Sequence, residues 1–366
     1  MHLLNLTKAT TMQTLLKALE NDERISEQDA YKLYDLDLFS LAKFAQKKRE
    51  KLHGKKVYFN INRHINPTNI CADTCKFCAF SAHRKNPNPY MMSYEEIMSV
   101  VDASVSRGIK EVHIVSAHNK DSSWQWYLEI FKMIKSKYPQ LHIKAMTAAE
   151  IDFLKRRWGL SYEESIEKMI EYGVDSMPGG GAEIFDEQIR AQICKGKVSS
   201  QNWLKIHELW HKKGRQSNAT MLFGHIETPA HRVEHILRLR ALQDITGGFN
   251  AFIPLVWQKD NSFLPVKQQV DSEEILKTIA ISRLVLDNVP HIKAYWATMG
   301  LNLAMVAQEF GANDLDGTIE KESIQSAGGA KSANGTALNT FIEMIQSSNL
   351  IPVERDSLYN ELKIYE

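Results

Sequence analysis

Three of the four cysteines in this 366-residue sequence, Cys71, Cys75 and Cys78, lie within eight residues of one another, whereas Cys194 is distant. A disulfide framework would spread its cysteines to close long loops, and this group does not. Thiolates spaced C-x3-C-x2-C can each bind one iron of a [4Fe–4S] cube and leave the fourth iron open. Structural zinc instead takes four ligands, and His83 is the one nearby candidate for a fourth. We therefore predict an iron–sulfur site at these three cysteines.

Alternating β-rich and amphipathic segments surround this loop. Eight short segments favour strands, at 57–65, 111–116, 141–147, 174–177, 216–223, 249–256, 291–296 and 313–317. Helices are expected between them, at 94–107, 124–138, 162–172, 200–213, 232–246, 272–286 and 301–310, several after a capping Ser or Asp. Eight strands alternating with helices predict an α/β fold with a parallel (β/α)8 barrel of the TIM type. Residues 57–317 are close to the roughly 250 residues of such a barrel.

The barrel prediction fixes the position of the cysteines. Catalytic groups of such barrels lie where strands end, and the cysteine loop directly follows the first expected strand. We therefore expect the iron–sulfur site at the mouth of the barrel. Residues 1–56 are expected to form a helical extension, and residues 318–366 a helical tail packed on the barrel.

Composition excludes several classes of protein. The 45 Lys and Arg residues balance 44 Asp and Glu residues, for a net charge of +1, so no nucleic-acid partner is expected. The longest strongly apolar stretch, 251–257, is far shorter than the ~20 residues of a membrane helix. The first residues have neither a basic region nor an apolar core, so we expect no secretory signal and a cytoplasmic location.

The cysteine motif resembles the hallmark of the radical S-adenosylmethionine (SAM) superfamily, C-x3-C-x-aromatic-C, with Phe77 as the aromatic residue. This resemblance implies that the methionyl amino and carboxylate groups of SAM chelate the open iron. One-electron reduction, by a donor such as flavodoxin or ferredoxin, would then cleave SAM to a 5′-deoxyadenosyl radical. Cys194 alone cannot hold a second cluster, so sulfur insertion of the biotin synthase kind is not expected.

Longer segments resemble the aminofutalosine synthase (aminodeoxyfutalosine synthase) family of the futalosine route to menaquinone. The similar segments are 62–69, 76–80, 142–151, 175–184, 217–228 and 247–255, and the resemblance extends from about residue 20 to residue 350. It implies addition of the adenosyl radical to the double bond of 3-[(1-carboxyvinyl)oxy]benzoate, with rearrangement and decarboxylation to 6-amino-6-deoxyfutalosine. SAM is then consumed as a co-substrate.

The resemblance also suggests site residues, each with a structural alternative. The cofactor-binding candidates are Phe77, Ser116, Ala117, Gly180, Glu183, Lys197, Gly224 and Glu227. Ser116 and Ala117 stand where many relatives have a glycine pair that approaches the methionine amino group. Glu183 can bond ribose hydroxyls or be a solvated helix-end acid, and Lys197 can lie near the methionine carboxylate or in solvent. Arg63, His64 and Arg84 are the candidate cations for the substrate carboxylates, although each type is more often structural.

Two other functions stay open. Dehypoxanthine futalosine cyclase shares the Pro178-Gly-Gly-Gly181-Ala-Glu183 segment, but usually has Ser-Pro-Pro-Glu where this chain has Thr147-Ala-Ala-Glu150. A non-catalytic iron–sulfur sensor would need a surface that binds nucleic acid or a partner protein. The balanced charge of this chain gives no sign of such a surface. Turnover of dehypoxanthine futalosine would identify the cyclase, and SAM binding to the reduced cluster would separate an enzyme from a sensor.

Overall fold

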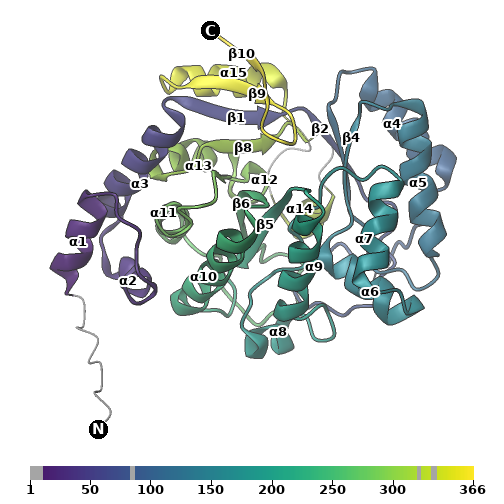
Figure 1. Ribbon diagram of the computed structural model, residues 1–366, viewed down its shortest axis with the longest axis horizontal. Coiled ribbons are helices and arrows are strands. Elements are labelled where there is room, and N and C mark those ends of the chain that lie inside the picture. The colour runs from purple at the N-terminus through teal and green to yellow at the C-terminus, as the bar shows by residue number, and fades with distance from the viewer. Residues whose placement is uncertain (1–10, 83–86, 320–322, 331–335) are drawn as a thin grey trace.

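A barrel of parallel strands forms the centre of the computed structural model, which describes residues 11–82, 87–319, 323–330 and 336–366 (Figure 1). The strands are β1 (Lys56–Asn60), β2 (Asn62–Ile65), β3 (Glu111–Ile114), β4 (His142–Ala145), β5 (Ser217–Phe223), β6 (Phe249–Val256), β7 (His291–Ile292) and β8 (Asp314–Gly317). In the described ranges, no helix is both long and apolar enough to span a membrane.

Strand pairing closes the barrel. The pairs β2–β3, β3–β4, β5–β6 and β6–β7 are parallel, and β8 pairs with β1. Single bridges join Lys144 to Ser176 and Met177 to Ser217, so residues 176–177 supply the strand expected between β4 and β5. A further bridge joins Lys293 to Asp314. Because β1 runs on into β2 after Ile61, these two strands together form the first barrel strand, and the predicted barrel is confirmed.

Helices cover the outside of the barrel, and many begin at the predicted caps. Ser93 and Ser161 each form a capping box with the Glu three residues later, and Asp271 caps its helix through the Glu274 amide. The helices are α4 (Tyr94–Val105), α5 (Trp124–Lys137), α6 (Ala148–Trp158), α7 (Tyr162–Glu171), α8 (Glu187–Ile193), α9 (Ser200–Lys212), α10 (Pro229–Thr246), α11 (Ser272–Val285), α12 (Trp296–Met299), α13 (Leu301–Val306) and η2 (Ala307–Phe310).

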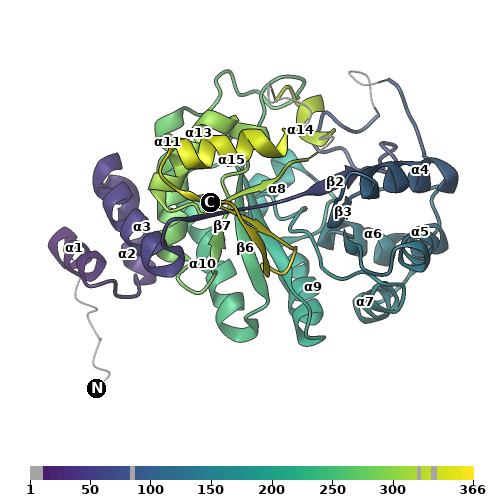
Figure 2. The same cartoon turned by 90° about the horizontal axis from the view of Figure 1, so that it is seen from above.

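The N-terminal segment is helical, as expected, and lies beside the barrel (Figures 1 and 2). It contains α1 (Met12–Glu20), α2 (Glu27–Lys32), η1 (Leu33–Asp35) and α3 (Leu38–His53). Helix α3 packs along α11, and Arg24 forms an ion pair with Asp244 of α10 at 2.5 Å. The division of the chain into an extension, a barrel and a tail stays a prediction.

The C-terminal tail corrects one expectation, because it is not wholly helical. Besides α14 (Ile324–Ala327) and α15 (Leu338–Ser347), it contains β9 (Ile351–Arg355) and β10 (Glu361–Ile364). Strand β9 pairs in parallel with β1, which gives a sheet in the order β10-β9-β1-β8. The pairing partner lies almost 300 residues earlier in the chain, and the short segment with Pro352 carries no strong strand pattern of its own.

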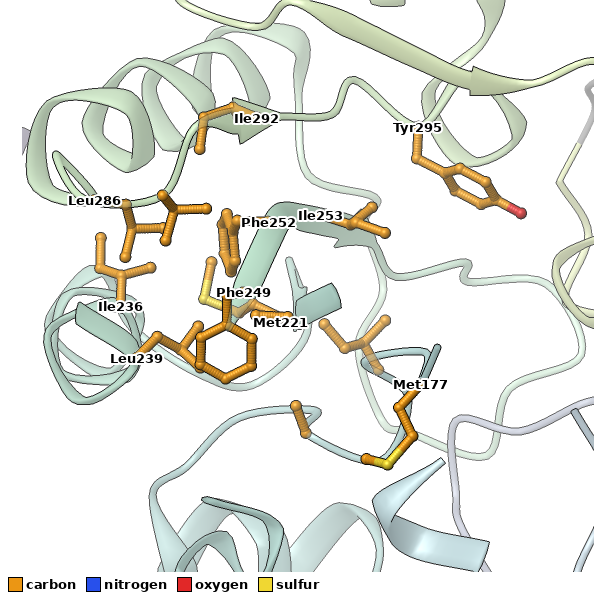
Figure 3. Close-up of a cluster of buried hydrophobic side chains, with 14 of the residues drawn as sticks. Met177, Met221, Ile236, Leu239, Phe249, Phe252, Ile253, Leu286, Ile292 and Tyr295 are labelled. Atoms are coloured by element: carbon orange, nitrogen blue, oxygen red, sulfur yellow. The ribbon is translucent and has the colours of Figure 1, made fainter. Parts of the chain in front are cut away.

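Apolar side chains fill the space between the strands and the covering helices. Figure 3 shows Ile236 and Leu239 of α10 beside Phe249 of β6, with Phe252 and Leu286 next to them. All five are buried. Tyr295 lies apart from this cluster, and its hydroxyl points away from it (Figure 3). This packing holds the strands in place from the outer face of the barrel. The carboxyl ends of the strands are therefore free to form a functional site.

Candidate active site

A cavity of about 270 Å³ opens at the carboxyl ends of the barrel strands. This volume is near the lower end of the range for small-molecule sites. Its walls include Cys71, Cys75 and Cys78, together with residues from the ends of β3, β4, β5, β6 and β8. The expected location of the cysteine loop at the mouth of the barrel therefore agrees with the structure.

Backbone hydrogen bonds anchor the cysteine loop to two neighbouring segments. The Ala72 amide donates to the His118 carbonyl at 2.9 Å, and the Lys76 amide donates to the Ile193 carbonyl at 2.8 Å. Asp73 Oδ2 lies 2.8 Å from His118 Nδ1. Burial alone would raise the pKa of Asp73, but the bond with His118 outweighs it and keeps this pKa below its usual value. The loop is therefore held from both sides.

The three cysteines have the donor chemistry that an iron–sulfur cube requires. Burial raises the pKa of Cys71, and that of Cys75 still further, so the thiolates depend on a bound metal charge to form. Among the described residues, no three His, Cys, Asp or Glu side chains converge as ligands of a single metal ion. In an iron–sulfur cube the three thiolates need not converge on one ion, because each thiolate binds a different iron. The residues present fit a [4Fe–4S] cluster with one open iron.

Ser116 and Ala117, at the end of β3, line the cavity beside the cysteine loop. The Ser116 amide donates to Glu150 Oε1 at 2.9 Å, and the other oxygen of Glu150 accepts from the Thr147 amide at 2.7 Å. Burial raises the pKa of Glu150. One carboxyl group thus joins the ends of β3 and β4 and fixes the backbone at Ser116.

Glu183, Lys197 and Phe77 form a group on another wall of the cavity. Lys197 Nζ lies 2.7 Å from Glu183 Oε1 and 5.6 Å from the centre of the Phe77 ring. Burial opposes the charge on Lys197, but Glu183 and the nearby cysteine thiols outweigh it and hold the pKa of Lys197 well above its usual value. Glu183 has a φ of +49°, a strained value for a residue other than glycine. The structure therefore places three of the predicted cofactor-binding residues together.

Gly180 lies on the same wall, in a turn pressed against β5. Its carbonyl accepts a hydrogen bond from Trp203 Nε1 at 3.2 Å, and the carbonyl of the preceding Gly179 accepts one from Thr220 Oγ1 at 2.6 Å. A Cβ atom on Gly179 would lie 2.7 Å from the Asn218 carbonyl oxygen. The turn needs glycine there because backbone fills the space of a side chain.

Three predicted site residues do not line this cavity, and the placement of a fourth is not described. Gly224 and Glu227 form a closed loop, in which Glu227 accepts from the Gly224 amide at 2.6 Å and from Arg232 Nε at 2.7 Å. Arg63 lines a neighbouring cavity, which meets the main one at His64 and Asn66. Arg84 lies outside the described residues. The roles given to these four residues stay predictions.

The floor of the cavity contains polar residues that the sequence analysis missed. Besides the predicted His64, it is lined by His113, Asn218 and Asp316, all from barrel strands. Asp316 has a φ of +71° and forms an ion pair with Lys293 at 2.7 Å. The polar residues at every second position of Asn62–Ile65 and Glu111–Ile114 were the available signal, because alternate residues of a barrel strand face inward.

Two family profiles together match most of this chain. The Radical SAM superfamily profile matches residues 65–239, and the CofH/MqnC C-terminal region profile matches residues 246–366. The aminodeoxyfutalosine synthase of Thermus thermophilus is 39% identical over 94% of both chains. That of Streptomyces coelicolor is 36% identical, over 96% of this chain and 94% of its own.

The chain belongs to the aminodeoxyfutalosine synthase family of radical SAM enzymes. The cyclic dehypoxanthine futalosine synthase of S. coelicolor is a further relative, 34% identical over 99% of this chain and 91% of its own. The family prediction is therefore confirmed, and membership implies a [4Fe–4S] cluster and SAM.

Solved structures agree with the barrel. The [FeFe]-hydrogenase maturase HydG from Carboxydothermus hydrogenoformans matches with a TM-score of 0.75, at 16% identity, over 95% of this chain and 80% of its own. Methylornithine synthase (PylB) matches with a TM-score of 0.74, at 15% identity, over 92% and 97%. At such identities the likeness concerns the fold alone.

Proposed function

We propose that this enzyme is an aminodeoxyfutalosine synthase that acts in menaquinone biosynthesis by the futalosine pathway. The observation that carries the proposal is the similarity to two enzymes of that name over almost the whole chain. The cavity adds to it, because its three cysteines face the inside of a barrel in the way that a radical enzyme requires. The expected place of action is the cytoplasm, where cysteines stay reduced.

Cys71, Cys75 and Cys78 would hold three irons of the cluster and leave the fourth for SAM. When bound, the reduced cluster and SAM supply a 5′-deoxyadenosyl radical. The Ser116 amide is already used by Glu150, so the Ser116–Ala117 segment would meet the methionine amino group through other atoms. Lys197 lines the cavity and would bind the methionine carboxylate, and Glu183, its ion-pair partner, would bond the ribose hydroxyls. Phe77, which lines the cavity, would pack against the bound SAM.

The substrate in this proposal is 3-[(1-carboxyvinyl)oxy]benzoate. The proposed reaction joins C5′ of the adenosyl group to the terminal alkene carbon, and moves the aryl group from oxygen to carbon. The enol-ether carboxylate leaves as carbon dioxide together with one electron, which replaces the electron spent on cleaving SAM. The product is 6-amino-6-deoxyfutalosine. The apolar walls formed by Ile253, Leu255 and Trp257 suit the aromatic ring and exclude water. The protein residues thus bind and orient the substrate and SAM, and the reaction requires no net proton transfer from them.

The cyclase is the second candidate, because its Streptomyces representative is nearly as similar over 99% of this chain. A substrate panel separates the two. Anaerobically reconstituted enzyme would be given SAM, a one-electron donor such as flavodoxin or ferredoxin, and either the enol ether or dehypoxanthine futalosine. We expect aminodeoxyfutalosine from the first compound and no turnover of the second. Formation of 5′-deoxyadenosine alone with the enol ether would contradict the addition reaction.

A further inference from the structure

Two histidines meet on the floor of the cavity, on adjacent strands. His64 of β2 and His113 of β3 are partners in the strand register, and both line the cavity. His113 Nδ1 lies 3.3 Å from His64 Nε2, and the two rings stand edge to face with centroids 4.6 Å apart. One proton can therefore be shared between the rings, and each ring keeps a second nitrogen for another partner.

The charged groups around this pair are already matched. Lys144 of β4 binds Glu111 of β3 at 2.7 Å, and Lys293, the residue after β7, binds Asp316 of β8 at 2.7 Å. These four groups are the charges that act on the histidine pair from the surrounding strands. Because each of these lysines already has a carboxylate partner, we look to the two histidines for the groups that bind a ligand here.

An unused nitrogen supports this assignment. Within the part of the chain that the structure describes, Nε2 of His113 is buried and has no hydrogen-bond partner. A buried polar atom without a partner costs free energy, roughly 1–3 kcal/mol, unless a ligand or water satisfies it. Burial lowers the pKa of His64 to about 4 and that of His113 well below its usual value, so the empty pair is neutral at pH 7.

We propose that the His64–His113 pair binds the ring carboxylate of the substrate, which is the carboxylate that the product keeps. The inference rests on the proposed function. The alkene must reach the adenosyl C5′ near the cysteine end of the cavity, so the ring carboxylate points to the opposite end. The apolar lining from Ile253, Leu255 and Trp257 matches the aromatic ring. The entering negative charge favours the protonated pair, so the enzyme takes up a fraction of a proton, up to one, when the substrate binds.

A matched set of variants and ligands tests the pair. His113→Asn and His64→Asn replace a titratable imidazole of the floor with a shorter amide that cannot take up a proton. His142→Asn is the control: His142 belongs to the next strand, β4, does not line the cavity and bonds Ser176 at 2.7 Å. The analogue 2-phenoxyacrylate lacks only the ring carboxylate. Dissociation constants would be measured calorimetrically with the cluster-loaded, unreduced enzyme and SAM, in buffers of different ionisation enthalpy. Iron content and melting temperature report whether each variant folds.

We expect His113→Asn to weaken binding of the full substrate about 10- to 100-fold, the range of a hydrogen bond to a charged group. It should leave the weaker binding of 2-phenoxyacrylate unchanged, and proton uptake should disappear. His142→Asn should bind both compounds as the wild type does. If His113→Asn lost iron or stability, His64→Asn would serve in its place.

Two results would overturn the inference, and they tell its failure apart from the failure of the proposed function. If the wild type forms aminodeoxyfutalosine, but the floor variants weaken both compounds equally or neither, the carboxylate is bound elsewhere. If the wild type neither binds nor converts the enol ether, the proposed function fails and the inference fails with it.

Discussion

Cys194 shows why proximity to the cluster loop does not make a cysteine a ligand. The carbonyl of its neighbour Ile193 binds the Lys76 amide of that loop, so Cys194 lies beside the other three cysteines. Its side chain is 2% exposed, and burial raises its pKa to about 11. Cys71, Cys75 and Cys78 instead line the cavity. The difference between the four residues is the face they present, not their distance from the loop.

Four single alanine variants test this difference. Cys71→Ala, Cys75→Ala and Cys78→Ala should each lose the cluster and all activity, because a cube held by two thiolates has two labile irons. Cys194→Ala should keep about four irons per chain. Iron and sulfide analysis after anaerobic reconstitution, side by side, is the measurement. Loss of iron from a folded Cys194→Ala would mean four protein ligands, and the open-iron mechanism would then fail.

The turn that contains Gly179 and Gly180, after residues 176–177, forms a cavity wall because it lies directly on β5. A Cβ on Gly179 would meet backbone atoms of Asn218 and Ala219 at 2.7 and 2.8 Å, and backbone there is fixed by strand pairing. A Cβ on Gly180 would meet only the methyl group of Thr147, at 2.9 Å. Neither glycine has a positive φ, so sterics alone separate them.

This pair of glycines gives a matched comparison. Gly179→Ala should lower the free energy of unfolding by about 1–3 kcal/mol, the usual cost of overpacking, because the strand cannot move away. Gly180→Ala should cost less, since one side-chain methyl can shift. Denaturant unfolding of the two variants beside the wild type measures both values. An equal loss in the two variants would show that the turn moves as a unit and that β5 does not limit it.

Sequence patterns correctly predicted the elements whose hydrogen bonds are formed between residues close together in the chain. The caps at Ser93 and Ser161 and the helices after them were predictable because their hydrogen bonds stay within one turn. Strand β9 was not, since its order depends on pairing with β1. His113 was missed for a related reason: its partner is set by the register of two strands, which a single sequence does not reveal.

Strand β9 is also held by a buried ion pair. Arg355 Nε lies 2.6 Å from Asp314 Oδ2 of β8, and both side chains are at most 1% exposed. Burial opposes the charge on Arg355, but Asp314 outweighs it and raises the pKa of Arg355 above its usual value. The pair therefore joins the C-terminal sheet to the barrel.

Removing one partner should be costlier than removing both. Arg355→Met should destabilise the protein by about 3–5 kcal/mol, because Asp314 is left buried without its cation. The double variant Arg355→Met with Asp314→Asn should recover part of this loss. Urea unfolding of the three proteins measures the difference. A double variant less stable than Arg355→Met would mean that Asp314 is needed for another contact, such as its bond from the Asp316 amide at 2.5 Å.

Across the whole molecule, several of the 13 histidines are buried or half-buried, and their imidazoles are neutral at pH 7. Burial lowers the pKa of His53, His64 and His211 to about 4, and that of His235 to about 3. In the unfolded chain each would titrate near 6.5. The folded protein therefore binds these protons only at a much lower pH than the unfolded chain does.

This difference predicts acid sensitivity with a definite sign. Between pH 6.5 and 4 the unfolded chain binds more protons, so the free energy of unfolding falls as the pH falls, by roughly 2 kcal/mol per such histidine at pH 5. Four of them cost about 8 kcal/mol, which is comparable to the whole stability of a typical domain. We expect the melting temperature to drop by at least about 10 °C from pH 7 to pH 5. The His235 imidazole bonds the Thr220 carbonyl at 2.9 Å, and the variant His235→Gln should reduce proton uptake on unfolding at pH 5 by about one. A melting temperature that stays level over this range would show that the imidazoles are protonated inside the folded barrel.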